Sequence, residues 1–414
     1  MATISLEGLG RRFLPIPGPV LYFAKDVVLL AGLLTIGLQP SVIRLTRRLA
    51  GPLPLLVSAT AVWGVLTLLH PDHPSVLLGL VGMRQYLLWW IAPLVCAAAM
   101  LQEGQSWRAE RILAFMAIGI AALAAYQFTQ PPDALVNAYV WGEDRSLVAT
   151  VTTTGRVRVT STFSYISGFA DFVILVVPIL LAAAVSAARR HSSRLFYAAS
   201  GCLAASAPLS GGRAVVMFVA ASLLAVLGFS GALRTRRGRL TLVAIVLAAG
   251  AGVWVVPEAA QGIQDRFDSE DTPQRIRDLA FAVPVYTLLN TKFPFLGAGV
   301  GTLQAAGVAF NVESKWEVEA EPQRVLIELG LPGYILVWLS RFVMTIGLVR
   351  LGRLLSRAGS PAWAAAAWVY AGMALLLPLT TDHVVQALFF VGVGWMLARV
   401  VQAQTPNPVA KPRS

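Results

Sequence analysis

Six ionisable side chains stand inside long apolar stretches of this sequence, and they are the residues best placed to do chemistry. Of the 414 residues, 57% are hydrophobic and only 13% are charged, whereas soluble domains average about 25% charged residues. A charge inside a membrane-spanning helix costs roughly 2.5–3.5 kcal/mol on insertion scales, so such a group is a functional candidate by default. The six residues are Lys25, Asp26, Arg84, Asp171, Glu328 and Arg341.

Five of these six charges are expected near one surface of a membrane. At 1.5 Å per residue, Lys25 lies roughly 7 Å and Arg84 roughly 12 Å beyond the start of its apolar run. Arg84 has no acid three or four residues away, so its partner must come from another helix or from a ligand. Lys25 and Asp26 are adjacent and could neutralise each other. Arg341 stands near the opposite end of its run, where snorkelling to the membrane surface explains it.

More arginines are expected at the same face. Arg213 follows two glycines that let the backbone approach a ligand closely, and Arg275 and Arg277 lie in a long connection. Arg324 follows Glu321 at a helix start, where the N-terminus favours an anion. Forked guanidinium groups suit phosphate. A cluster of this kind, half sunk in lipid, predicts a phosphate or diphosphate that is carried on a lipid.

Eleven charge-poor runs define the helices that must position these residues. Ten of them approach or exceed the length of a spanning helix, which is about 20 residues, and the run 194–209 is shorter. We therefore expect an all-α, polytopic integral membrane protein with about 11–12 transmembrane helices, a single domain over 1–402 and a disordered tail over 403–414. Two long connections span about 130–160 and 257–322. The runs are 20–38, 53–70, 76–100, 111–129, 163–187, 194–209, 213–231, 239–256, 323–343, 361–379 and 383–401.

Lysine and arginine are divided unequally between the connections. One alternate set, together with the C-terminal tail, holds eighteen cations against the two acids Glu103 and Glu110. Cytoplasmic loops carry such an excess, so both long connections are assigned to the outside. Eleven spans place the N-terminus outside, and a twelfth span before Val20 would place it inside. Topology then explains most of the net charge of +12, and we expect no nucleic-acid partner.

The remaining reactive residue types point to neither a metal nor a cofactor. The four histidines do not cluster in sequence; His383, beside Asp382, could reach the cavity, but it is interpreted as a packed interface residue. Cys96 and Cys202 fall in separate apolar runs, so no disulfide is expected.

Four segments, in order, resemble motifs of the O-antigen ligase/polymerase superfamily of bacterial envelope enzymes. Together they cover about 150–345, roughly half of the chain. They are Arg158-Val-Thr-Ser-Thr-Phe at the fifth apolar run, Leu209-Ser-Gly-Gly-Arg213 before the seventh, Arg277 or Arg275 followed by Pro294-Phe-Leu-Gly-Ala-Gly299, and Glu328-Leu-Gly-Leu-Pro-Gly333.

This resemblance implies a metal-independent, inverting glycosyltransferase with a GT-C-like arrangement of helices. It implies polyprenyl-diphosphate-linked glycans as donor and acceptor, and an active site at the periplasmic face of the bacterial cytoplasmic membrane. Arg213 and Arg277 would bind the donor diphosphate. Supporting substrate contacts would come from Arg84, Arg158, Arg275, Arg324 and Lys25.

The resemblance leaves the acceptor and the catalytic base open. Ligases of this superfamily carry a histidine before the last motif, and Glu319 stands at that distance here. This departure favours a polymerase of exopolysaccharide, capsule or O-antigen, with Glu319 or Glu321 as the base. A ligase that transfers glycan to lipid A or protein is an alternative, and so is a flippase for lipid-linked sugars. Expected partners are membrane lipids, a chain-length regulator and a flippase.

Overall fold

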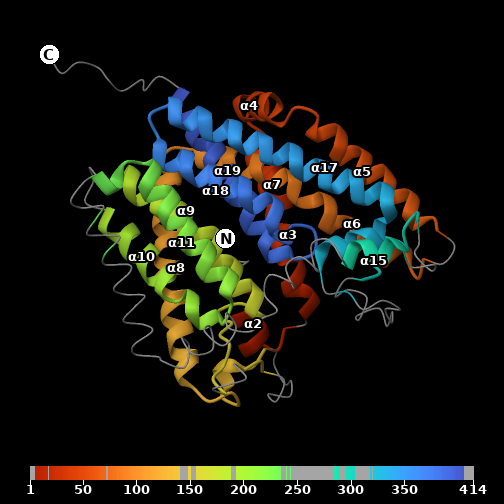
Figure 1. Cartoon of the computed structure of the whole chain (residues 1–414), viewed down its shortest axis with the longest axis horizontal. Helices are drawn as coiled ribbons and strands as arrows, with labels where there is room; N and C mark the ends of the chain where they lie inside the picture. The colour runs from red at the N-terminus through yellow and green to blue at the C-terminus, as the bar shows by residue number, and fades with distance from the viewer. Residues whose placement is uncertain are drawn as a thin grey trace.

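The computed structural model describes residues 5–16, 18–70, 73–139, 148–150, 155–187, 193–234, 239, 243, 283–289, 295–303, 318 and 320–404. Over these residues the fold is helical, apart from one isolated bridge between Thr150 and Val157 (Figure 1). Its α-helices are α2 (Glu7–Phe13), α3 (Gly18–Ile36), α4 (Pro40–Ala50), α5 (Leu53–Leu68), α6 (Val76–Leu87), α7 (Ala92–Leu101), α8 (Gln105–Thr129), α9 (Ile166–Ser186), α10 (Ser193–Ala205), α11 (Arg213–Phe229), α15 (Val283–Leu289), α17 (Glu321–Arg357), α18 (Pro361–Leu376) and α19 (His383–Gln404).

Ten of the eleven apolar runs are confirmed as helices, and the run 239–256 falls almost wholly outside the described residues. Within the described part, five helices are long and apolar enough to cross a membrane, and a sixth results if the bent pair α3–α4 is one span. This is the pattern of a polytopic membrane protein. Three further apolar helices, α5, α11 and α18, are shorter. The five are Val76–Leu101, α8, α9, α17 and α19.

Helix α4 occupies a connection between two apolar runs, where the sequence analysis predicts no helix. It is bent by 120° from the preceding helix. Val42, Leu45 and Leu49 are buried along one side, whereas Arg44 and Arg48 are exposed on the other. This division is typical of a helix that lies in the plane of a membrane interface with its arginines in the headgroup region.

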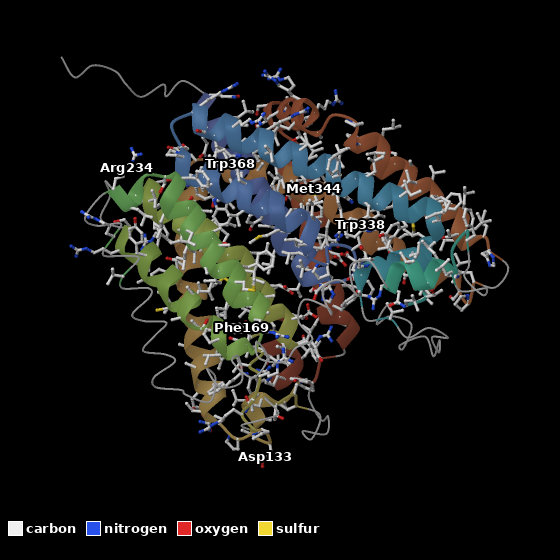
Figure 2. The ribbon with its side chains drawn as sticks, viewed as in Figure 1. Asp133, Phe169, Arg234, Trp338, Met344 and Trp368 are labelled. Carbon is white, nitrogen blue, oxygen red and sulfur yellow. The ribbon has the colours of Figure 1, made fainter. Side chains whose placement is uncertain are left out.

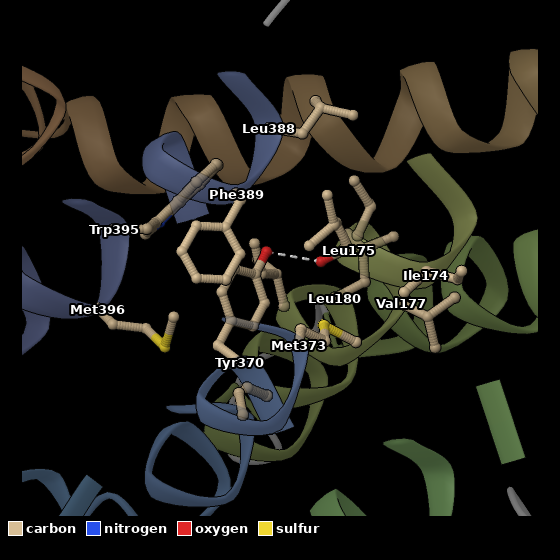
Figure 3. Packing of buried hydrophobic residues seen from close by; sticks show 14 of the residues in the cluster. Ile174, Leu175, Val177, Leu180, Tyr370, Met373, Leu388, Phe389, Trp395 and Met396 are labelled. Carbon is tan, nitrogen blue, oxygen red and sulfur yellow. Dashed lines mark hydrogen bonds between the residues drawn. The ribbon is translucent and has the colours of Figure 1, made fainter. Parts of the chain in front are cut away.

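The core forms around α9. Of the most apolar 18 residues of this helix, 89% are buried. Helices α10, α11, α18 and α19 all pack against it. Tyr370 of α18 stacks on Phe389 with 5.2 Å between ring centroids, and its hydroxyl donates to the carbonyl oxygen of Leu175 at 2.8 Å (Figure 3). This bond satisfies the one polar group that a tyrosine brings into an apolar core.

The connections gather at two ends of the helix bundle. At one end an ion pair joins Arg399 of α19 to Glu110 of α8, and α4 packs there on α17 and α19. Figure 2 shows Arg234 at the upper left and Asp133 at the bottom, at opposite ends of the part of the bundle that contains α8 and α11. We call the end with α4 and Arg234 the arginine-rich end, and the end with Asp133 and α2 the cavity end.

Helix α17 is interrupted at Gly330, whose φ of 65° and ψ of −174° are not helical. The interruption lets a loop approach the helix backbone directly: the N–H of Leu331 donates to the carbonyl oxygen of Phe295 at 3.0 Å. A Cβ at position 330 would lie 2.3 Å from that carbonyl oxygen. Only glycine fits this position, because both the positive φ and the close backbone exclude a side chain.

Replacing Gly330 by alanine therefore tests the break in α17. We expect Gly330→Ala to lower the free energy of unfolding by roughly 1–3 kcal/mol from backbone strain alone, as measured by denaturation of the purified protein. Gly119→Ala on α8 is the matched control, since its Cβ would meet nothing within 4 Å. Equal stability of the two variants would contradict the break.

Candidate functional site

A polar cavity of about 360 Å³ opens at the cavity end, where α2, α9 and α19 meet. It is the most polar of the described cavities of this size, and its lining combines acids, bases, hydroxyls and two tyrosine rings. The rings of Tyr139 and Tyr165 meet edge to face with centroids 5.5 Å apart. The residues that matter for its chemistry are Glu7, Arg11, Tyr139, Tyr165, Ser167, Asp382 and His383.

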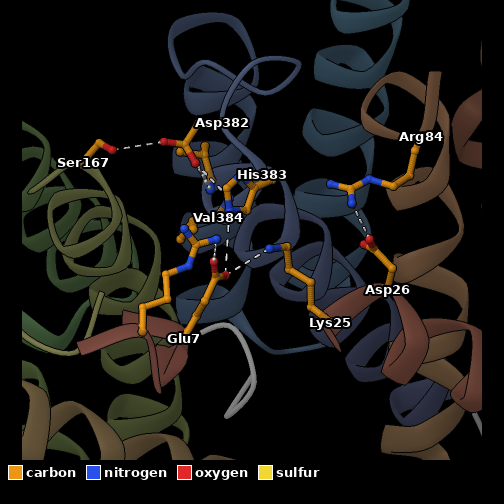
Figure 4. Close-up of polar contacts among 10 residues, drawn as sticks. Glu7, Lys25, Asp26, Arg84, Ser167, Asp382, His383 and Val384 are labelled. Carbon is orange, nitrogen blue, oxygen red and sulfur yellow. Dashed lines mark hydrogen bonds and ion pairs between the residues drawn. The ribbon is translucent and has the colours of Figure 1, made fainter. Parts of the chain in front are cut away.

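Glu7 is the carboxylate around which the cavity's charges are arranged (Figure 4). Its Oε1 pairs with Nη2 of Arg11 at 2.7 Å, and its Oε2 pairs with Nζ of Lys25 at 3.1 Å. The Nε2 atom of His383 lies 3.8 Å from the same Oε2. One buried carboxylate therefore holds two cations and an imidazole from three separate helices.

Arg84 and Asp26 form a second pair beside this cluster. Their closest atoms, Nη1 and Oδ2, are 2.7 Å apart, and the guanidinium lies over the rings of Tyr22 at 4.4 Å and Phe23 at 4.8 Å. Of the two sources expected for the partner of Arg84, another helix or a ligand, the structure shows another helix, α3. The interpretation that Lys25 and Asp26 neutralise each other is wrong, because each pairs with a residue from elsewhere in the chain.

Asp382 caps the start of α19 at the cavity wall. Its Oδ1 accepts the N–H groups of Val384 at 2.8 Å and Val385 at 3.2 Å, and its Oδ2 accepts the hydroxyl of Ser167 at 3.2 Å. Burial raises the pKa of the Asp382 carboxyl, and these donors offset part of that shift. His383 follows at once and packs against Tyr22, so its predicted packing is confirmed, but it also lines the cavity.

The N-terminal helix α2, which carries Glu7, is anchored by a fully buried arginine. Arg12 donates through Nε to the carbonyl oxygen of Ala138 at 2.6 Å, through Nη1 to that of Ser161 at 2.9 Å, and through Nη2 to the hydroxyl of Thr160 at 2.7 Å. Burial lowers the pKa of this guanidinium to about 10. Arg12 thus fixes α2 against the connection that supplies Tyr139 to the cavity.

Arg158 and Arg213, both expected near phosphate, flank the same turn. The Nε atom of Arg158 donates to the carbonyl oxygen of Ser210 at 3.3 Å, and Arg213 begins α11 two residues after Gly211. Gly211 has a φ of 66°, and a Cβ there would lie 3.1 Å from that Nε atom. The structure therefore brings these two predicted site residues to one turn, and their binding of phosphate stays a prediction.

The glycine run at 297–301 and the Glu328 motif also meet in space. The N–H of Ala298 donates to the carbonyl oxygen of Ile327 at 2.7 Å, and that of Gly299 donates to Glu328 at 3.1 Å. The Glu328 carboxylate accepts the hydroxyl of Tyr86 at 2.8 Å and the N–H of Leu303 at 2.9 Å. Glu328 is buried, so its observed contacts are those of a residue that holds this loop in place.

Glu321, one of the two proposed bases, is engaged in an internal ion pair. Its Oε1 atom contacts Nη2 of Arg341 at 2.6 Å and accepts the N–H and the hydroxyl of Thr380, each at 2.5 Å. The expectation that Arg341 snorkels is wrong, because its side chain is only 3% exposed and faces Glu321 across the break in α17. The break at Gly330 makes this contact between residues twenty positions apart possible.

Three of the predicted site residues, Glu319, Arg275 and Arg277, lie outside the described residues. Arg324 is described on α17, where it is half-buried and takes part in none of the ion pairs of the described residues. In the described part of the chain, no group of three or more His, Cys, Asp and Glu residues is arranged to hold a metal ion.

Sequence reasoning missed Glu7, Arg11 and Arg12, because they precede the first apolar run. The spacing of Glu7 and Arg11, which favours an i,i+4 ion pair on a helix, could have indicated α2.

In a comparison with known proteins, no protein-family model matches the chain, and no curated protein matches its sequence.

The Arg84–Asp26 pair can be tested by removing one partner and then both. Leaving a buried charge unpaired costs about 3–5 kcal/mol, whereas replacing both partners by apolar residues costs much less. We expect Arg84→Met to lower the free energy of unfolding by that amount, and the double variant Arg84→Met/Asp26→Leu to recover most of it. Denaturation of the purified protein measures both.

Arg350→Met, at an exposed position of α17, is the control for the loss of one positive charge. If Arg84→Met is no less stable than Arg350→Met, the buried pair does not exist as described.

Proposed function

We propose that this protein is a membrane glycosyltransferase that acts on oligosaccharides carried by undecaprenyl diphosphate, at the extracytoplasmic face of a bacterial cytoplasmic membrane. The observation that supports this most is the polar cavity at the end of the molecule opposite the arginine-rich connections. By the distribution of Lys and Arg, the cavity end is the extracytoplasmic one. The proposal includes 11–12 spans in a GT-C-like arrangement.

The lining of the cavity suits a sugar better than an ion. Within the lining, the charge of Arg11 is paired with Glu7, and Asp382 already accepts three hydrogen bonds, so these charged groups are engaged and offer little to a free ion. Paired charged groups and hydroxyls present directed donors and acceptors, which are what specific polar recognition in a cleft requires. The tyrosine rings add flat apolar surface of the kind that packs against a sugar ring.

The lipid diphosphate is assigned to the arginines near the Ser210–Gly212 turn. Arg158 and Arg213 flank this turn, and a planar guanidinium binds phosphate oxygens through two parallel hydrogen bonds. The proposal adds Arg275, Arg277 and Arg324 as further ligands of the diphosphate. Arg84 and Lys25 already have the carboxylate partners Asp26 and Glu7. In this proposal they therefore position the helices around the polar cavity and do not bind the diphosphate directly.

In the proposed reaction, an acceptor sugar hydroxyl attacks the anomeric carbon of the donor. The new glycosidic C–O bond forms as the bond from that carbon to the phosphate oxygen breaks, and the diphosphate leaves with the electron pair, so the anomeric centre inverts. A carboxylate takes the hydroxyl proton. Because Glu321 is committed to Arg341 and Thr380, Glu319 is the preferred base of the two. The arginines stabilise the charge that develops on the leaving diphosphate.

The acceptor distinguishes the alternatives within this proposal. A polymerase uses another lipid-linked repeat unit, whereas a ligase uses lipid A or a protein. The absence of a histidine at position 319 favours the polymerase. A flippase would move the same lipid across the membrane without forming a bond. In a purified system it would therefore produce no glycan longer than the one supplied.

Arg213→Ala and Arg277→Ala test the proposal directly. We expect the purified wild-type protein in nanodiscs to extend a lipid-linked repeat unit, and each variant to lose about 10²- to 10³-fold in kcat, the usual effect of removing a group that stabilises transition-state charge. Gel analysis of the glycan products measures the chain length.

Arg350→Ala at the arginine-rich end is the matched control and is expected to keep wild-type activity. Wild-type polymer from both Arg213→Ala and Arg277→Ala would refute the assigned roles, and no extension by the wild type with any acceptor would favour the flippase.

A further inference from the structure

Two adjoining cavities lie inside the helix bundle, away from the polar cavity at its end. The first, which we call the polar chamber, measures about 20 Å³; most of its lining is apolar, and Arg341, Thr380 and Gln386 are among the polar residues in its wall. The second, the apolar slot, measures about 360 Å³ and lies between α4, α5, α7, α17 and α19. Val57, Trp90, Met344 and Phe390 line both. The two cavities therefore lie side by side, one with several polar side chains in its wall and one with an almost wholly apolar wall.

The polar chamber contains hydrogen-bond donors that the described residues do not satisfy. Arg341 gives Nη2 to Glu321 at 2.6 Å and lies over the ring of Trp338 at 4.9 Å. Its Nε and Nη1 atoms are buried and have no hydrogen-bond partner among the described residues. A buried donor without a partner is unfavourable, and more so when it is charged. These two N–H groups therefore favour an oxygen atom in the chamber.

The same chamber contains one unsatisfied acceptor. Gln386 donates through Nε2 to the carbonyl oxygen of Gln85 at 2.6 Å, which fixes the orientation of its amide. Its Oε1 atom is buried and has no hydrogen-bond partner in the described part of the chain. The unsatisfied groups are thus donors on Arg341 and an acceptor on Gln386. A hydroxyl group, with one donor and two acceptor lone pairs, complements them.

The charge and the volume of the polar chamber limit which chemical group can occupy it. The Glu321 carboxylate already balances the charge of Arg341, so an added anion would be buried beside a carboxylate, which is costly. The volume of about 20 Å³ fits a single water-sized group, for which about 10–15 Å³ is needed. A phosphate or a sugar is too large for this chamber, whereas one hydroxyl fits.

The apolar slot has the size and lining of a site for an aliphatic chain. Apolar cavities of about 150 Å³ bind small hydrocarbons, and this slot is more than twice as large. Leu49, Leu53, Leu94, Leu348 and Leu397 are among the residues that line it. The polar chamber adjoins it, so the chain that fits it ends in one small polar group.

We propose that this site binds a single-chain lipid alcohol, with its hydroxyl between Arg341 and Gln386 and its chain in the slot. The uncharged hydroxyl is far less costly to bury at this depth than a phosphate. The site is separate from the cavity that holds Glu7, and the proposal holds whether or not the protein is a glycosyltransferase.

The test is photolabelling of the purified full-length protein in phospholipid nanodiscs, with a long-chain alcohol that carries a diazirine in its chain. We expect saturable labelling of peptides from α5, α7, α17 and α19. Farnesol should compete at a concentration about tenfold or more below that of farnesyl phosphate, because the phosphate must be desolvated beside Glu321. Labelling that does not saturate, or equal competition by the phosphate, would overturn the proposal in favour of bulk lipid or ordered water.

Two variants locate the ligand within the site. Val57→Trp fills the slot and should abolish saturable labelling, whereas Val62→Trp, on the 62% exposed side of the same helix, should leave it unchanged. Gln386→Leu removes one hydrogen bond and should weaken competition by farnesol about fivefold, which keeps the test valid if the tryptophan variant folds poorly. Equal labelling in all three variants would contradict the assignment.

Discussion

Pairing of charges inside an apolar bundle is the constraint on which this structure depends. An unpaired charge in a lipid environment is costly, and several of the buried charges in the described part of the chain are paired with an opposite charge. The pairs that join different helices then fix how those helices meet. The cluster around Glu7 joins α2, α3 and α19, and the polar cavity lies where they converge. The pairs are Glu7 with Arg11 and Lys25, Asp26 with Arg84, Glu321 with Arg341, and Glu110 with Arg399.

Gly330 determines how the loop at 295–303 and the two parts of α17 come together. The break at Gly330 lets the loop at 295–303 bond to the backbone of α17, and it brings Glu321 within reach of Arg341. Glu328 then holds the loop through Leu303. The glycine run at 297–301 and the Glu328 motif, which resemble a ligand-binding loop in the sequence, therefore serve to attach this loop to α17.

The sequence predicted the parts of this fold that follow from periodicity and composition. Apolar runs gave the helices, and the lack of a local acid gave the interhelical partner of Arg84. The Glu321–Arg341 pair could not be predicted from the sequence. Pairs on an unbroken helix are expected three or four residues apart, and these two residues, twenty positions apart, meet only because the helix is interrupted at Gly330. Glu7 was missed because α2 precedes the first apolar run, although its spacing to Arg11 carried a signal.

In the proposed orientation, the cavity end faces the outside of the cell and the arginine-rich end faces the cytoplasm. Single cysteines at Asp133 and Arg234, introduced after Cys96 and Cys202 are replaced by alanine, test this orientation by labelling intact cells with a membrane-impermeant maleimide. We expect Asp133→Cys to be labelled in intact cells and Arg234→Cys to be labelled only after permeabilisation. The reverse pattern, or labelling of both in intact cells, would contradict it.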